Sequence, residues 1–120
     1  MTYLDWIGAA GAVATTAMGG LGLAAPRVCA KLVGLRATSL AGFAEFRATY
    51  GGVFLVLGLG PLATSSPDIF LMSGLAWLAA AAGRILSIVV DGTFDSPNVR
   101  AVIVEFAFAI SLVAGAAGFS

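Results

Sequence analysis

The sequence predicts an all-α fold: an integral membrane four-helix bundle with a short amphipathic segment between helices 1 and 2. Of 120 residues, 60% are hydrophobic and only 10% are charged, whereas soluble domains average about 25% charged residues. The mean hydropathy is +1.04. The apolar residues form four long stretches separated by Pro, Ser, Asp and Gly. We therefore expect one transmembrane domain, residues 1–120.

The first span is expected at about residues 6–25, because this stretch carries no charge and is long enough to cross about 30 Å of hydrocarbon. Tyr3 and Trp6 stand at its start, where amphipathic rings favour the headgroup level. One side of the helix is small and suits close helix packing, unless the Ala and Gly content reflects only a GC-rich genome. That side comprises Gly8, Gly11, Ala12, Thr15, Gly19 and Gly20.

A proline ends the first span, and an amphipathic piece follows over residues 27–40. Arg27, Lys31 and Arg36 alternate there with apolar residues. Such a segment is expected along the membrane surface, with its basic groups near the lipid headgroups. Either Thr38 or Ser39 is placed to cap the next helix.

Three further spans are expected at about residues 41–62, 67–90 and 97–118. Pro61 and the Ser65–Pro67 segment are expected to end the second span. Ser66 followed by Pro67 is a helix start signal, and Ser96 followed by Pro97 has the same form. Asp91-Gly92 marks the end of the third span.

Ionisable residues inside these spans are the candidate site. A charge at the centre of a lipid-embedded helix costs about 2.5–3.5 kcal/mol on insertion scales, so it needs a partner or a wet cavity. At 1.5 Å per residue, Arg84, Glu105 and Arg47 each lie roughly 9–12 Å inward from the helix ends on one side of the membrane. The candidate buried polar cluster is Glu45, Arg47, Tyr50, Arg84, Ser87, Asp91 and Glu105.

We expect Arg84 to pair with Glu105, and Arg47 to pair with Glu45 or Asp91, because an arginine fork binds a carboxylate through two parallel hydrogen bonds. Two interpretations stay open. The pairs either fix the helix register without any ligand, or they form a polar pocket roofed by Tyr50 and Ser87.

Several classes of function are disfavoured by composition. The formal net charge is zero, so no basic excess exists for binding nucleic acid. The chain has no histidine and a single cysteine, Cys29. The common general base and the usual zinc ligands are therefore missing, and we expect no cofactor and no metal site.

The polar positions also carry a family resemblance. The run Glu45-Phe46-Arg47-Ala48-Thr49-Tyr50-Gly51-Gly52 is followed by Gly83-Arg84, Ser87, Asp91-Gly92 and Glu105. This pattern resembles the small bacterial membrane proteins grouped as domain of unknown function 4345, over about positions 6–118. The resemblance implies a four-span bundle with these polar residues in spans two to four, and it implies no activity.

Three functions are consistent with these features. The first is a non-enzymatic bundle that binds membrane lipid or an amphipathic ligand, or serves as an accessory subunit of a larger membrane complex. The second is a small transporter or channel working as a homo-oligomer. The third, a membrane enzyme acting on lipid or isoprenoid, is the least favoured, because no evident nucleophile accompanies the carboxylates.

The basic residues also predict an orientation. Four spans place both termini on one side, and the six Lys and Arg residues then fall on or near the opposite side. The positive-inside rule makes that opposite side cytoplasmic. We expect a multi-pass protein of the bacterial inner membrane with both termini in the periplasm.

Overall fold

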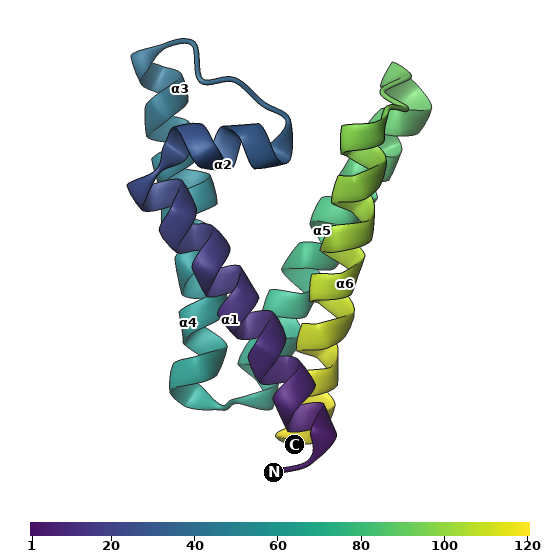
Figure 1. Ribbon diagram of the computed structural model, residues 1–120. Helices are drawn as coiled ribbons and strands as arrows, with labels where there is room; N and C mark the ends of the chain where they lie inside the picture. Colours follow the sequence, from purple (N-terminus) through teal and green to yellow (C-terminus); the bar gives the residue numbers. More distant parts are fainter.

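The computed structural model describes residues 1–120 and contains only helices (Figure 1). The order is α1 (Tyr3–Ala24), α2 (Pro26–Val33), α3 (Leu40–Glu45), η1 (Phe46–Val53), α4 (Phe54–Thr64), α5 (Pro67–Asp91) and α6 (Ser96–Gly118). The segments α3, η1 and α4 form one continuous helix, in which η1 has π-helical hydrogen bonding. Four helices are long and apolar enough to span a membrane: Tyr3–Ala24, Leu40–Thr64, Pro67–Asp91 and Ser96–Gly118.

Three of the four spans form two arms that meet at one end and diverge at the other, and α1 connects the arms (Figure 1). One arm contains η1 and α4, and the other contains α5 paired with α6. Both chain termini lie at the end where the arms meet, as four spans require. At the open end, α2 lies across the top of the first arm and extends towards α6.

The first helix connects the two arms by running diagonally between them. A Cβ atom added to Gly8 would lie 2.2 Å from the Cα atom of Gly115 in α6, so the two backbones touch near the termini. A Cβ atom on Gly19 would lie 2.3 Å from the amide nitrogen of Leu55 in α4. The small side of α1 is therefore a packing surface, which was one of the two interpretations left open. Among the glycines of α1, only Gly20 has no atom within 4 Å of its added Cβ position.

A small aromatic core lies where α1 meets both arms. Phe70, Trp77 and Leu112 are buried there together with Ala12 and Ala109. The Trp77 indole Nε1–H donates to the Thr15 hydroxyl over 3.1 Å, and that hydroxyl donates to the Gly11 carbonyl over 2.8 Å. These bonds satisfy the polar atoms that the core buries, as a dry interior requires.

Pro61 does not end the second span, contrary to the sequence-based prediction, because α4 continues through it to Thr64. A proline inside a helix leaves the carbonyl four residues earlier without its amide donor. Here that carbonyl belongs to Leu57, and it accepts a hydrogen bond of 2.8 Å from the hydroxyl of Ser73 in α5. The neighbouring helix therefore replaces the missing bond, which is how membrane helices tolerate proline.

The helix ends agree with most of the sequence signals. Ser39 and Ser66 cap α3 and α5 through their side chains. Gly92 ends α5 in the left-handed region, with a φ of 68°. The cap of α6 is Asp95 rather than Ser96: its carboxylate accepts the amide of Asn98 over 2.9 Å. Asp caps as well as Ser does, and it stands one residue earlier.

The amphipathic segment is shorter than its sequence pattern suggested. The helix α2 covers only Pro26–Val33 and ends at Gly34, whose φ of 74° is left-handed. Residues 35–38 are not helical. Cys29 and Ala30 pack inward against Phe46, while Arg27 and Lys31 are exposed. One side of the segment therefore faces the protein and the other faces outward.

Candidate functional site

The ion pair between Arg84 and Glu105 joins α5 to α6, as the sequence predicted. The Arg84 Nε atom donates to Glu105 Oε1 over 2.6 Å. The Glu105 side chain is only 8% exposed and the Arg84 side chain 26%. Arg84 binds Glu105 through Nε alone and not through two parallel hydrogen bonds, because its Nη1 atom binds another residue.

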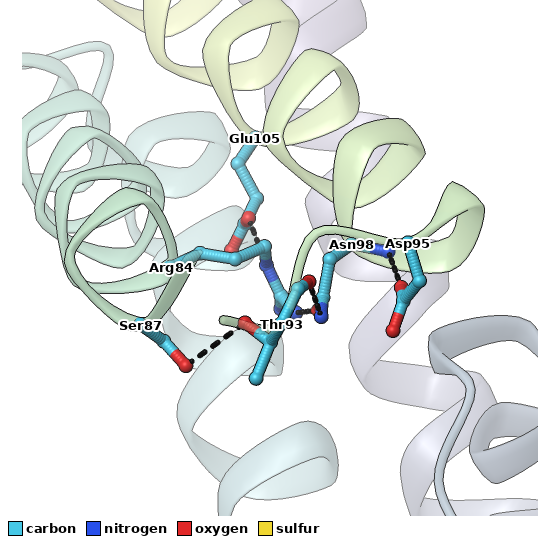
Figure 2. A network of polar contacts seen from close by, with 6 residues as sticks. All are labelled: Arg84, Ser87, Thr93, Asp95, Asn98 and Glu105. Atoms are coloured by element: carbon cyan, nitrogen blue, oxygen red, sulfur yellow. Dashed lines mark hydrogen bonds and ion pairs between the residues drawn. The ribbon is translucent and has the colours of Figure 1, made fainter. Parts of the chain in front are cut away.

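The Nη1 atom of Arg84 binds Asn98, a residue that the sequence analysis missed (Figure 2). Arg84 Nη1 donates to Asn98 Oδ1 over 2.9 Å, and Asn98 Nδ2 donates to the Thr93 carbonyl over 2.7 Å. Asn98 stands seven residues before Glu105, so both occupy one face of α6. The spacing was a usable signal, but an uncharged residue in the first turn of a helix drew no attention.

Ser87 and Asp91 extend this network toward the membrane surface. The Ser87 hydroxyl donates to Asp91 Oδ2 over 2.9 Å and lies 3.1 Å from the hydroxyl of Thr93. Asp91 is exposed and forms no ion pair. The Ser87–Thr93 contact holds the α5–α6 loop against the end of α5, next to the Arg84–Asn98 bond (Figure 2).

Arg47 pairs with neither Glu45 nor Asp91, so this part of the prediction is wrong. Its Nη1 donates instead to the backbone carbonyl of Leu23. Leu23 lies in the last turn of α1, where carbonyls lack intrahelical donors and where the helix dipole favours a cation. Glu45 is exposed and accepts the Thr49 hydroxyl over 2.7 Å. Residues two apart on a helix do not face each other, so a similar expected depth does not bring Glu45 and Arg47 together.

Four of the seven candidate residues line one hollow between the arms: Tyr50, Arg84, Ser87 and Glu105. This hollow has a volume of about 360 Å³. A second cavity of about 150 Å³ shares Tyr50, Arg84 and Glu105 with it and continues past Phe54 to Trp77. The ion pair therefore stands in the wall of a cleft whose larger part is lined mostly by polar residues and whose smaller part is lined mostly by apolar residues, with Arg100 also in its wall.

Aromatic rings form a continuous row along this cleft. The ring centroids of Phe46 and Tyr50 are 5.0 Å apart, and those of Tyr50 and Phe54 are 5.5 Å apart. Phe54 then contacts Trp77 at 4.8 Å, which contacts Phe108 at 4.8 Å. The row runs from the α2 end of the first arm to the second arm, and such offset or edge contacts stabilise aromatic pairs.

Polar atoms at this cleft remain available for a further partner. The hydroxyl of Tyr50, Nη2 of Arg84 and Oε2 of Glu105 form no hydrogen bond within the protein. None of them is among the fully buried polar atoms without a partner. They are therefore not fully buried, and the residues that carry them line the cleft, which offers donors and an acceptor beside an aromatic wall.

The helices define this chain as a small multi-pass membrane protein with a polar cleft near one end of its spans. It belongs to the family described as Domain of unknown function (DUF4345), which it matches over residues 3–116. This is the family that the polar motifs resembled. Neither the curated proteins nor the solved structures contain a match to the chain.

Proposed function

We propose that this protein is a non-enzymatic ligand-binding bundle whose cleft receives an amphipathic small molecule. The observation that supports this is the position of the Arg84–Glu105 pair in the cleft wall, where both residues keep hydrogen-bonding atoms that no protein group uses. An ion pair that served only to hold two helices together would not need unsatisfied groups beside a cavity.

The two sides of the cleft suit the two ends of an amphiphile. Arg84, Glu105 and Tyr50 offer donors and an acceptor to a polar head. Phe54, Trp77 and other apolar side chains line most of the adjoining space, which suits a hydrocarbon portion, and Arg100 adds a cation to its wall. Known ligand pockets have the same composition, mostly apolar walls with a few polar groups that set orientation.

The proposal is tested by fluorescence quenching in a Trp6→Phe background, where Trp77 is the single tryptophan. Bromine atoms quench an indole that they touch, and Trp77 is 4% exposed, so bulk detergent does not reach it. Dibromostearate added to the full-length protein in neutral detergent should quench Trp77 with saturation. An uncharged brominated monoacylglycerol tests whether the head must be anionic.

A matched pair of variants makes the test specific. Ala101 lines the cavity, whereas Ala107 on the same helix is exposed and lines none of its walls. Ala101→Leu should raise the Kd obtained from the quenching curve at least about tenfold, which corresponds to a loss of about 1.4 kcal/mol of binding free energy. Ala107→Leu should leave this Kd unchanged. Equal quenching in both variants, or no saturable quenching by either probe, would overturn the proposal. Copurification of a stoichiometric protein instead of an amphiphile would point to an accessory subunit.

We also propose that the open end of the arms faces the cytoplasm of a bacterial inner membrane. Arg27, Lys31 and Arg36 lie at that end. Asp68 lies in the first turn of α5, at the opposite end of the molecule. The excess of basic residues supports this orientation. In a Cys29→Ala background, a membrane-impermeant maleimide added to intact cells should label Ser120→Cys and not Ala41→Cys. The reverse labelling would refute the orientation.

A further inference from the structure

A basic hollow at the open end forms a second candidate binding site, separate from the cleft. It lies between α2, the non-helical residues 35–38 and the start of α3, and has a volume of about 920 Å³. Its walls include three cations, Arg27, Lys31 and Arg36. They also include the Thr38 and Ser39 side chains.

The three cations of this hollow have no anionic partner in the protein. The one ion pair of the structure is Arg84–Glu105, and no carboxylate lines the hollow. Arg27 is held over the ring of Phe43, with 5.3 Å between its guanidinium carbon and the ring centroid. A cation–π contact orients a guanidinium without neutralising it. The hollow therefore carries an uncompensated positive charge.

Apolar side chains at the rim distinguish the expected occupant from a free anion. Leu40 is 88% exposed and Leu35 is 47% exposed, and both line the hollow. The first span, of 22 residues, is about 33 Å long, so α2 begins at the depth where hydrocarbon gives way to headgroups. At that depth a cationic hollow rimmed by exposed leucines is complementary to a phosphate with an acyl chain attached.

We infer that this basic hollow binds the headgroup of an anionic phospholipid, with Arg27, Lys31 and Arg36 around the phosphate and the leucines against the acyl chains. The hydroxyl of Ser39 accepts the amide of Gly42 and keeps its own proton for donation. It is therefore placed to give a hydrogen bond to a phosphate oxygen, as the side chain of Thr38 is. The site does not involve the Arg84–Glu105 cleft.

Native mass spectrometry of the full-length protein tests this inference. Phosphatidylglycerol or phosphatidylcholine with the same acyl chains is added to the protein in neutral detergent, and bound lipid is counted. Phosphatidylglycerol should bind at least about tenfold more tightly, because each cation near an anionic headgroup adds attraction. The triple variant Arg27→Gln, Lys31→Gln, Arg36→Gln should lose this preference.

Two controls separate the headgroup site from other causes. Arg27→Lys with Arg36→Lys keeps all three charges and should retain the preference, while Ala101→Leu alters only the cleft and should leave it unchanged. Melting in lipid-free detergent shows whether each variant is folded. Equal binding of the two lipids, or retention of the preference by a folded triple variant, would overturn the inference. So would displacement of phosphatidylglycerol by inorganic phosphate alone, since that result would assign the hollow to a free anion.

Discussion

The Ser73 hydroxyl in α5 donates to the Leu57 carbonyl in α4, the acceptor that Pro61 leaves without an amide donor. This bond joins the two arms, and α4 and α5 make far fewer contacts with each other than α5 makes with α6. It also shows how a proline in the second span is compatible with an unbroken helix.

Removing the Ser73 hydroxyl should destabilise the protein because the Leu57 carbonyl is then left unsatisfied. Ser73→Ala should lower the free energy of unfolding by about 1–3 kcal/mol. Pro61→Ala restores the amide donor, so Ser73→Ala should cost much less in that background. Unfolding in mixed detergent micelles measures both. Equal cost in the two backgrounds would show that the hydroxyl does not serve the carbonyl.

The contact between Gly8 and Gly115 should tolerate no side chain. Gly8→Ala places a Cβ atom 2.2 Å from the Gly115 Cα atom and 3.2 Å from the Phe70 ring, so α1 must move away from α6. We expect a loss of roughly 1–3 kcal/mol, as for overpacked cores. Gly20→Ala is the matched control, because open space surrounds its added Cβ atom. A melting temperature equally unchanged in both variants would contradict the packing described.

The Arg84–Glu105 pair should show coupling in a double-mutant cycle. Arg84→Ala leaves a carboxylate that is only 8% exposed without its cation, and Glu105→Ala leaves the guanidinium with Asn98 alone. The two changes together should therefore cost less than their sum, by roughly 0.5–3 kcal/mol. Additive losses would mean that the two side chains do not stabilise each other in the folded protein.

Cys29 should resist alkylation in the folded protein. Its side chain is fully buried, and burial raises the pKa of the Cys29 thiol above its usual value. A raised pKa lowers the thiolate fraction at any given pH, so the reaction should be slow at neutral pH and should accelerate as the pH rises. Maleimide labelling followed by mass spectrometry measures the rate.

The control for this measurement is Ala41→Cys in a Cys29→Ala background. Ala41 is exposed at the start of α3, so its replacement thiol should react at neutral pH as a free thiol does. Unfolding in sodium dodecyl sulfate should abolish the difference between the two positions. Rapid labelling of Cys29 in the native protein would show that α2 leaves its packing against Phe46.

Much of the candidate site could be predicted from depth along the helices. Arg84 and Glu105 stand at similar distances from the helix ends that flank one short loop, so their pairing followed from the lengths of α5 and α6. Depth gives no information on how each helix is rotated about its axis. Arg47 was expected at a similar depth, but it lies in the π-helical stretch and binds the Leu23 carbonyl at the end of α1.

The sequence by itself determined the four spans, most of their ends and the class of membrane protein, because hydrophobic length and the Pro, Ser, Asp and Gly signals are local properties of the chain. Only the tertiary structure decided that the spans form two diverging arms joined by α1, and that Asn98 shares Arg84 with Glu105. These features depend on close contacts between helices distant in sequence, such as Gly8 with Gly115. Which surfaces meet is set by their combined shapes rather than by the pattern of any one helix.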